Sequence, residues 1–592
     1  MKFFSALFTF PMWVSALVLF APPVQSQTAA QPREVRKKLI QVGWDQPSTS
    51  YVRHNWRRME SSTPFDGITL VAKFKHNGKE FDENSVQIST KWPRSALEDA
   101  LSDLQSAKFE RMKHNFVRVN SSPGSLDWFK DSDWEAACSN IANIAWLARQ
   151  GGLKGILFDA ESYGDKQYKW KAESGHDFQR TFEQARRRGA QMMRAIAREY
   201  PDITVWSLWL FSLNRQAAAS GNRLGLESDN YGLWPAFLNG WLDELPIGAR
   251  MIDGTEDAYY FQSNQRFAEV YNEVRNPNGV LLSTLLDPKH RNKYQTQVSM
   301  SFGIYLDAYL DPATSSFYLG AIGDGTRLGR MRDTVAKALE VADDYVWIYN
   351  EQVKWWPLDT PQWAEGSFYL NSAKSRPGGG RLVDEALPGA TDQLRWARDP
   401  VGETRRVIEA ARVAKTLQNL AQNSSFEATQ SKIQAAPAVA DSTTGDVPAY
   451  SSWQQDGSKG SFALDKQVGR PAGAARMQGV GEGCYIQRLP VRDGQIFHVE
   501  ADCLAQGQTR SEIIVRWANA AGKLTMWGDS QTLPIKKDLG GGWKRAEGSV
   551  AVPTGASFMV VLLAANHQRP DDKCWWDNLG IHDMADLFKS KP

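Results

Sequence analysis

The sequence predicts an α/β fold, a (β/α)8 barrel over residues 36–421, followed by an all-β jelly-roll sandwich over residues 422–592. Strand-like and helix-like stretches alternate eight times from residue 38, which is typical of a parallel sheet with crossover helices. A linker rich in Ala, Ser and Gln covers 422–440, and beyond it only short alternating segments between Gly, Pro and Asp turns occur. A doubly wound sheet is the alternative, although no Gly-rich phosphate loop follows the first strand.

The alternation gives each barrel element a position. We expect strands at 38–45, 65–72, 115–121, 153–161, 204–211, 248–254, 300–308 and 344–351. Helical spacing occurs between them at 50–61, 94–112, 133–149, 176–199, 232–243, 258–273 and 327–342. An eighth helix is expected at 401–421, after a segment rich in Pro and Gly. In TIM barrels of this kind the active site lies at the C-terminal ends of the strands.

The N-terminus has the pattern of a secretory signal peptide over residues 1–26. Lys2 precedes a long apolar stretch, and small Ser26 precedes a cleavage position near Gln27. An uncleaved membrane anchor is the alternative, but Pro11 interrupts the apolar run. No later segment reaches the roughly 18 apolar residues that a membrane helix needs. We therefore expect a secreted or periplasmic protein that has no membrane contact after cleavage.

Composition limits the function classes. The formal net charge of +2 gives no strong field toward nucleic acid. The 23 Trp residues suit stacking on sugar rings, although Trp also fills cores. Of the four Cys, three (Cys484, Cys503 and Cys574) lie near the C-terminus, so at most one disulfide forms there. No C-x-x-C or His cluster indicates zinc.

Two acids at the end of the fourth strand are the main candidates for catalysis. Asp159 and Glu161 follow the apolar run of "LKGILFDAESY", and residues i and i+2 of a strand share a face. Like charges at that distance raise each other's proton affinity, and such sites are often functional. A pair of loop carboxylates held by caps or Arg is the alternative. Polar residues also end the other strands: Asp45, Asn120, Asp253, Asp307, and Asn350 with Glu351.

The stretch "ILFDAE" resembles the Asp-x-Glu strand end of chitinase-like glycoside hydrolases. That resemblance implies that Glu161 protonates the glycosidic oxygen and that Asp159 positions an N-acetyl group. The fuller Asp-x-x-Asp-x-Asp-x-Glu signature is absent, because Gly155, Ile156 and Leu157 stand where further acids would be.

The C-terminal region resembles jelly-roll carbohydrate-binding modules of the family 4/9/22 type. The resemblance rests on the opening Asn423–Glu427 stretch and on Trp575-Trp576-Asp577-Asn578-Leu579 near the end. It implies a structural calcium ion held by Glu427 and Asp577. Trp517, Trp527 and Trp543 are candidates for sugar stacking or for the core.

These observations predict a secreted glycoside hydrolase that acts on a polysaccharide or glycan without a catalytic cofactor. Glu161 is the expected acid, and the second carboxylate is Glu351, Asp253, Glu256 or Asp307. Substrate contacts are expected from Asp45, Asn120, Tyr163, Asp307, Tyr349, Trp355 and Trp356. A non-catalytic carbohydrate-binding protein and a metal-dependent barrel enzyme are the alternatives.

Overall fold

The computed structural model describes residues 37–584, apart from 173–174, 220, 323–324, 359–362, 428–442, 445–446, 493–494, 525–529 and 554. The predicted signal peptide at 1–26, Trp527 and the linker from residue 428 onward lie outside the described residues.

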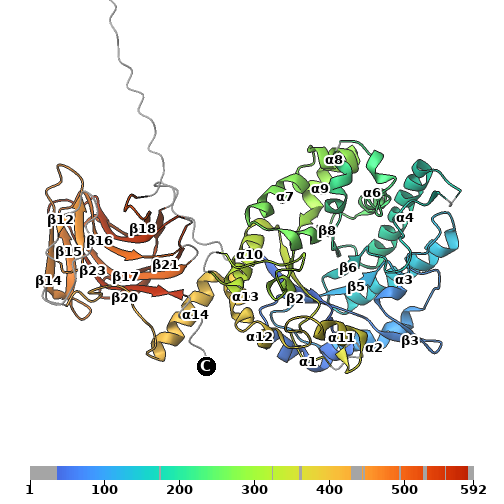
Figure 1. Cartoon of the computed structure of the whole chain (residues 1–592), viewed down its shortest axis with the longest axis horizontal. Helices are drawn as coiled ribbons and strands as arrows, with labels where there is room; N and C mark the ends of the chain where they lie inside the picture. Colours follow the sequence, from blue (N-terminus) through green and yellow to red (C-terminus); the bar gives the residue numbers. More distant parts are fainter. Residues whose placement is uncertain are drawn as a thin grey trace, which may run out of the picture. The chain divides into compact units, whose positions relative to one another are not determined.

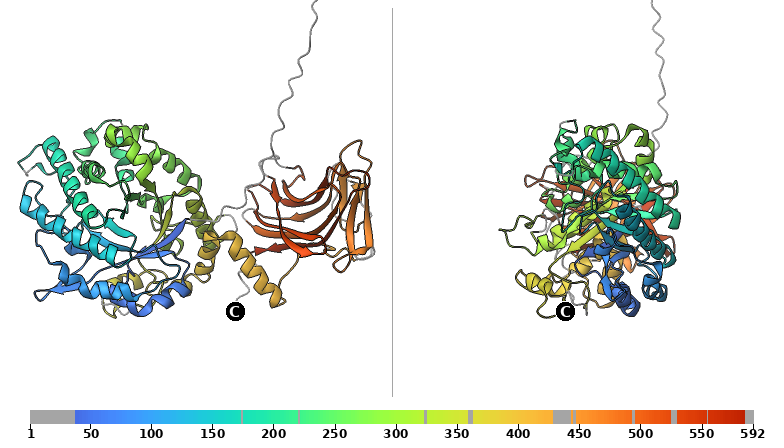
Figure 2. Two further views of the ribbon diagram at one scale, coloured as in Figure 1. Left: turned by 180° about the vertical axis from the view of Figure 1, so that it is seen from behind. Right: turned by 90° about the vertical axis from the view of Figure 1, so that its right-hand side faces the viewer.

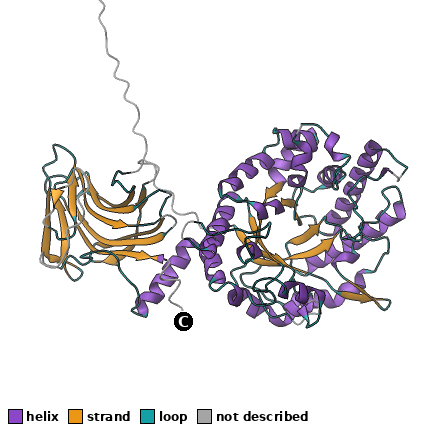
Figure 3. Cartoon of the chain, viewed as in Figure 1, coloured by secondary structure: helices purple, strands orange, loops and turns teal. Residues whose placement is uncertain are grey.

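Nine parallel strands form one sheet in the N-terminal region, and helices surround it (Figures 1 and 3). The strands are β1 (Lys38–Gly43), β2 (Gly67–Leu70), β5 (Phe116–Asn120), β6 (Gly155–Asp159), β7 (Thr204–Ser207), β8 (Arg250–Asp253), β9 (Val298–Met300), β10 (Phe302–Tyr305) and β11 (Tyr345–Asn350). Their order is β10-β11-β1-β2-β5-β6-β7-β8-β9. Only Ser301 separates β9 from β10 in the chain, so the two ends of the sheet meet and the barrel is nearly closed.

Each of the eight segments predicted as barrel strands contains an observed strand, and the parallel pairing confirms the α/β class. The seventh segment is divided between β9 and β10. The strands are apolar on both faces because one face lines the barrel interior and the other is covered by helices. Inside the barrel, Trp206 contacts Phe116, Tyr345 and Trp347, which come from strands that are not its neighbours in the sheet.

The helices of this region pack around the sheet, with the exception of the last one. They are α1 (Thr49–Ser62), α2 (Glu98–Ser106), α3 (Asp131–Gln150), α4 (Phe178–Glu199), α5 (Arg215–Ala218), α6 (Trp234–Glu244), α7 (Gln265–Arg275), α8 (Val280–Leu285), α9 (Arg291–Gln297), α10 (Arg327–Val341), α11 (Phe368–Lys374), α12 (Val383–Ala386), α13 (Ala390–Arg398) and α14 (Pro400–Val413). Glycine allows α4 and α6 to approach closely. A Cβ at Gly240 would lie 2.0 Å from the Arg186 carbonyl oxygen, so any larger residue would separate the two helices.

The predicted eighth helix at 401–421 differs from the observed structure. α14 ends at Val413, and the helix that packs against α10 is α13, which the sequence analysis did not predict. Arg398 at the end of α13 holds Asp66 through a bidentate ion pair with distances of 2.8 and 2.9 Å. α14 instead contacts the following β region, where Arg412 donates to Glu500 at 2.7 Å. Both segments are amphipathic, and amphipathicity alone does not say which surface a helix covers.

The C-terminal region consists of two antiparallel six-stranded sheets (Figure 2). One has the order β12 (Thr443–Thr444), β13 (Ser451–Gln454), β16 (Glu482–Pro490), β22 (Phe558–Asn566), β18 (Arg510–Ala518) and β19 (Gln531–Leu533). The other has the order β14 (Ser461–Gly469), β15 (Ala472–Gln478), β23 (Lys573–Asp583), β17 (Ile496–Gln506), β21 (Trp543–Ala551) and β20 (Ile535–Gly540). The predicted all-β region is therefore confirmed as a pair of antiparallel sheets.

Alternation along β17 separates the core of this region from a polar face. Val499, Ala501 and Cys503 join the apolar cluster between the sheets, whereas Glu500 and Asp502 lie on the opposite face of the same strand. Trp517 is buried in that core. Trp543 packs with Ala474 and Trp575 in a separate apolar cluster. All four cysteines are buried and free. Among the described residues, no helix is long and apolar enough to cross a membrane.

Candidate active site

A cavity of about 750 Å³ opens at the C-terminal ends of the barrel strands. Its wall is built by the segments that follow the strands. The lining residues that carry charge are Glu83, Arg118, Glu161, Arg215, Asp229, Glu256, Asp257 and Glu351. The aromatic lining residues are Trp44, Tyr163, Trp209, Tyr259, Tyr260, Tyr305, Phe317, Tyr349 and Phe368. Five residues predicted for the site, Glu161, Tyr163, Glu256, Tyr349 and Glu351, therefore share one cavity.

Glu161 lies two residues beyond the end of β6. The strand stops at Asp159 because the carboxylate of that residue accepts the backbone N–H of Glu161 at 2.9 Å, a local turn that competes with strand pairing. Burial and the neighbouring charge of Asp159 raise the pKa of Glu161, and hydrogen bonding by Tyr163 partly opposes that rise. The predicted effect of Asp159 on Glu161 is therefore present in the structure.

Asp159 itself is fully buried and does not line the cavity. Its Oδ2 accepts hydrogen bonds from Arg118 Nη2 at 2.5 Å and from Asn120 Nδ2 at 2.9 Å. Arg118 and Asn120 lie on the neighbouring strand β5, where Asn120 is in register with Asp159. Asn120, a predicted substrate contact, thus holds a carboxylate below the cavity. The ion-pair alternative describes Asp159, whereas Glu161 is the member of the pair that reaches the cavity.

Glu256, in the segment after β8, is a second carboxyl group whose pKa is raised. Glu256 begins the 3₁₀ turn η6 (Glu256–Tyr260) and lines the cavity. Burial, followed by the charges of Asp159 and Glu161, raises its pKa well above the ordinary value. No hydrogen bond to its carboxyl oxygens is found within the described part of the chain.

Backbone strain positions Glu256. Thr255, the residue before it, has φ 47° in the left-handed region, which a β-branched residue rarely adopts. Strain of this kind costs on the order of 1–3 kcal/mol and clusters at functional sites. Gly254 makes the turn possible, because a Cβ there would lie 2.6 Å from the carbonyl oxygens of Ser207 and Leu208.

Glu351 follows β11 and lines the same cavity. It accepts hydrogen bonds from the Tyr305 hydroxyl at 3.0 Å and from the Tyr349 hydroxyl at 3.2 Å. Arg376 Nη1 lies 3.5 Å from the same carboxylate. Rings of Tyr259, Tyr305 and Tyr349 stack or tilt against one another with centroids 5.4–5.8 Å apart. Glu351 is therefore a charge-neutralised carboxylate fixed by an aromatic cluster.

Several predicted site residues are placed below the cavity. Asp253 accepts the Ser212 hydroxyl at 2.5 Å and the Ser212 N–H at 3.0 Å, which anchors the loop after β7. Asp45 accepts the Trp355 N–H at 2.7 Å, and burial raises its pKa to about 6. That bond draws the chain after β11 inward, so Trp355 and Trp356 are buried in the core instead of lining the cavity.

Asp307 is also a buried support residue. Its Oδ2 accepts the backbone N–H groups of Glu351 at 2.6 Å and Gln352 at 3.1 Å, while its Oδ1 has no partner in the described structure. Burial raises its pKa to about 7 despite those two bonds. The residue fixes the backbone of Glu351 and does not line the cavity.

Asp307→Asn should stabilise the protein at pH 8. The folded-state pKa of about 7 exceeds the ordinary value of 3.8, so the unfolded state binds fewer protons between these pH values. The contribution of Asp307 to stability is present below pH 4 and is lost as the pH rises through 7, at a cost of up to about 4 kcal/mol. Asn keeps an oxygen for both N–H donors and never ionises. Urea unfolding at pH 4 and pH 8 should show a gain at pH 8 only; an equal effect at both pH values would contradict this.

Sequence reasoning did not identify Arg118 and Glu83. Arg118 lies in "NFVRVNS" at the interior parity of β5, and a lone cation in an apolar strand was the available signal. Glu83 belongs to the 3₁₀ turn η1 (Glu83–Ser85) after the hairpin of β3 (Phe74–His76) and β4 (Lys79–Phe81). No pattern in the sequence connects that insertion with the barrel mouth.

The two predicted calcium ligands lie close together in the C-terminal region. Asp577 is buried on β23, and its carboxylate accepts the N–H groups of Arg470 at 2.5 Å and Asn578 at 2.7 Å. Burial, with the charges of Asp502 and Glu427, raises its pKa to about 6. The Ser425 and Phe426 carbonyl oxygens and the Glu427 side chain converge on Gly473, each 3.4 Å from where a Cβ would lie.

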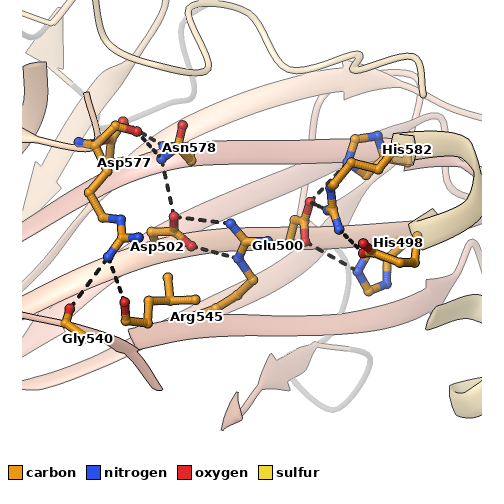
Figure 4. Close-up of polar contacts among 12 residues, drawn as sticks. His498, Glu500, Asp502, Gly540, Arg545, Asp577, Asn578 and His582 are labelled. Atoms are coloured by element: carbon orange, nitrogen blue, oxygen red, sulfur yellow. Dashed lines mark hydrogen bonds and ion pairs between the residues drawn. The ribbon is translucent and has the colours of Figure 1, made fainter. Parts of the chain in front are cut away.

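A network of hydrogen bonds and ion pairs extends from this point across the sheet (Figure 4). Arg545 holds Asp502 through a bidentate ion pair and contacts Glu500 at 3.2 Å. Within the described residues, His498, Glu500 and Glu547 are the group of metal-ligating side chains whose ligand atoms lie within 4.8 Å of one another. Glu500 is already neutralised by Arg545 and Arg412, and its pKa is lowered to about 2.

Comparison with known proteins gives weak likenesses. No family model matches the chain, and no curated protein matches it. Among solved structures, the enzymatically active domain of tailspike protein 4 from bacteriophage CBA120 is 14% identical with a TM-score of 0.20; the match covers 28% of this chain and 21% of that domain. The CBM22-1 xylan-binding domain of Paenibacillus barcinonensis Xyn10C is 11% identical with a TM-score of 0.19, covering 27% of this chain and 90% of that domain.

A third structure is the CBM22-1–GH10 part of endo-1,4-β-D-xylanase 10B from Clostridium thermocellum, complexed with xylohexaose. It is 9% identical with a TM-score of 0.19, and the match covers 23% of this chain and 26% of that one. The second and third of these neighbours are described as a xylan-binding domain and as part of a xylanase. At this level of likeness they carry no argument for the present chain, so its function has to be argued from the site.

Proposed function

We propose that the barrel is a glycoside hydrolase that cleaves glycosidic bonds in a polysaccharide or glycan by carboxylate acid/base catalysis. One observation carries the proposal: Glu161 and Glu256, two carboxyls whose pKa values are both raised, line the same aromatic-walled cavity. Glycoside hydrolysis needs one protonated and one ionised carboxyl at the scissile bond. Groups whose environments raise their pKa values to different extents fill those two roles.

The pKa directions support a division of roles. Glu256 has no hydrogen-bond donor in the described structure and is raised the more strongly, so it keeps its proton and donates it to the glycosidic oxygen. Glu161 is assisted in its ionised form by Tyr163 and by the charge of Arg118, so it acts on the anomeric carbon directly or through water. The C–O bond to the leaving sugar breaks, its oxygen keeps the proton, and water supplies the hydroxyl of the new reducing end. This assignment moves the predicted proton donor from Glu161 to Glu256.

The experiment that tests this function is a panel of neutral, N-acetylated, amino and acidic polysaccharides, with product sizing. Wild-type protein should release shorter oligosaccharides from at least one of them. If it binds a glycan without releasing product, the alternative of a carbohydrate-binding protein replaces the proposal. If a chelator removes activity while the fold remains intact, the alternative of a metal-dependent enzyme replaces the proposal.

The finer description of the fold belongs with this proposal. We count β9 and β10 as one strand interrupted at Ser301, which gives the eight strands of a TIM barrel. We regard the C-terminal sheets as a jelly-roll carbohydrate-binding-like module that starts near residue 422. Export as a secreted or periplasmic protein is proposed as well. An intact mass that begins near Gln27 would support it, and a mass that includes residues 1–26 would contradict it.

We further propose that Glu427 and Asp577 hold a structural calcium ion in the C-terminal module. The donor set suits calcium, because the Glu427 and Asp577 carboxylates interact electrostatically and the Ser425 and Phe426 carbonyl oxygens lie beside the Glu427 side chain at Gly473, and all of these are hard oxygen ligands. The ion would neutralise buried acidic charge and tie the start of the module to β23.

Calcium should therefore stabilise the module. At a concentration of about 100 times Kd, it should add about 2.7 kcal/mol to the free energy of unfolding, and EDTA should remove that gain. Thermal unfolding with calcium, with EDTA and with calcium restored measures the effect. Asp577→Asn should abolish the response, whereas Asp538→Asn on β20 should keep it. A wild-type melting temperature that is unchanged by calcium would rule out the site.

A further inference from the structure

The charges around the barrel cavity are unequal. Six carboxyl groups line it, and the cations among its lining residues are Arg118 and Arg215. Each of these arginines is already in an ion pair, Arg118 with Asp159 and Arg215 with Asp257. An incoming anionic sugar would therefore meet carboxylates and no unpaired cation on the described wall.

Four of the acids have no ion-pair partner in the described structure. They are Glu83, Glu161, Asp229 and Glu256. The proposed reaction does not use Glu83. Its Oε2 atom is inaccessible to solvent and accepts no hydrogen bond from the described residues. A buried carboxyl oxygen without a donor is costly unless a ligand supplies one.

The local fold holds Glu83 in place. Asp82 caps the turn η1 by accepting the Asn84 N–H at 2.9 Å, and the Ser85 hydroxyl receives the Asp82 N–H at 3.3 Å. The turn follows the β3–β4 hairpin, which is an insertion after β2. Burial and the charge of Asp82 raise the pKa of Glu83, the charge of Arg118 partly opposes that rise, and the residue lines the same cavity as Glu161 and Glu256. A rigid carboxyl group outside the reacting pair is suited to selecting a substrate that brings a positive charge.

We propose that the cavity takes a glycan whose sugar units carry a protonated amine, and that Glu83 receives the ammonium group. The inference rests on the proposed function and names its substrate class. An ammonium group offers three N–H donors and one positive charge, which matches an unpaired carboxylate in an acidic cavity. An N-acetylated sugar offers one N–H and no charge, and a uronic acid would be repelled.

Two pairs of oligosaccharides test this: hexamers of glucosamine and of galactosamine, each against its fully N-acetylated form, with a hexamer of galacturonic acid as the anionic probe. Binding is measured by calorimetry on the full-length Glu161→Gln protein, which prevents turnover. At least one amine hexamer should bind about tenfold or more tightly than its acetylated form, and higher salt should reduce that ratio. Equal binding within both pairs, or tighter binding of the acetylated or acidic hexamers, would overturn the proposal.

Glu83→Gln in the same background should reduce the amine-to-acetyl ratio about tenfold. Glu80→Gln is the matched control, because Glu80 lies on the same hairpin with an exposed side chain paired to Lys75. An unchanged ratio in Glu83→Gln would remove the assignment of Glu83. Wild-type hydrolysis of the panel separates the two ideas: cleavage of neutral glycans with no preference for amines keeps the hydrolase and removes this inference. Selective binding of amine hexamers without cleavage of any glycan keeps this inference and removes the proposed hydrolase function.

Discussion

Glu256→Gln is expected to lower turnover of a natural glycan by about 10²–10⁴-fold, the contribution that a positioned general acid makes. Gln keeps the size of the side chain and removes the proton that the leaving sugar needs. Because the acid matters least when the leaving group is already stable as an anion, an aryl glycoside should be affected much less. The alkaline limb of the pH–rate profile, set by loss of the Glu256 proton, should also disappear.

Glu161→Gln provides the contrast in this experiment. It removes the group that acts on the anomeric carbon, so natural glycan and aryl glycoside should both lose most of their turnover. Glu340→Gln on α10 is the control, because its side chain is 69% exposed and pairs only with Lys337 among the described residues. Wild-type turnover in Glu256→Gln would remove it as the acid, and the reverse pattern of substrate dependence would return that role to Glu161.

Arg118→Met should destabilise the barrel by about 3–5 kcal/mol, the usual cost of leaving one member of a buried ion pair without its partner. Asp159 has no exposed side-chain surface and Arg118 only 16%, so solvent cannot replace the lost charge. Methionine fills the volume of the removed stem but supplies no donor to Asp159. Urea unfolding at neutral pH, with the wild-type protein as reference, measures the loss.

A double-mutant cycle identifies the cause of that loss. Asp159→Asn alone leaves the Arg118 charge without its counter-ion, whereas Arg118→Met with Asp159→Asn leaves no unpaired charge. The double variant should therefore be more stable than the sum of the single losses allows. Additive losses, or a loss below about 1 kcal/mol for Arg118→Met, would show that the pair does not stabilise the fold.

Periodicity was sufficient to predict the barrel. Apolar runs at eight places, each followed by a helical pattern, are typical of strands that are buried on both faces, and such runs can be recognised in the local sequence. The same reasoning placed Glu161 and Glu351 at the cavity, because each is two residues after a strand residue, Asp159 or Tyr349, whose parity it shares.

Local patterns did not predict which strand-end acids would reach the cavity. Asp253 and Glu256 are three residues apart. The left-handed conformation of Thr255 directs the chain so that Glu256 lines the cavity, whereas the hydrogen bond from Ser212 holds Asp253 below the cavity. Trp355 resembles a stacking residue in sequence, yet its N–H bond to Asp45, 310 positions away, draws it into the core.

The sequence by itself determined the class of each region, the strand positions and the two acids that parity carries to the barrel mouth. Only the tertiary structure decided that Arg118 neutralises Asp159, that Glu83 joins the site from an inserted hairpin, and that α13, not α14, packs against α10. The reason is physical: the periodic pattern of apolar residues is set by near neighbours in the chain. Ion pairing, desolvation and helix docking depend on residues that only the folded chain brings together.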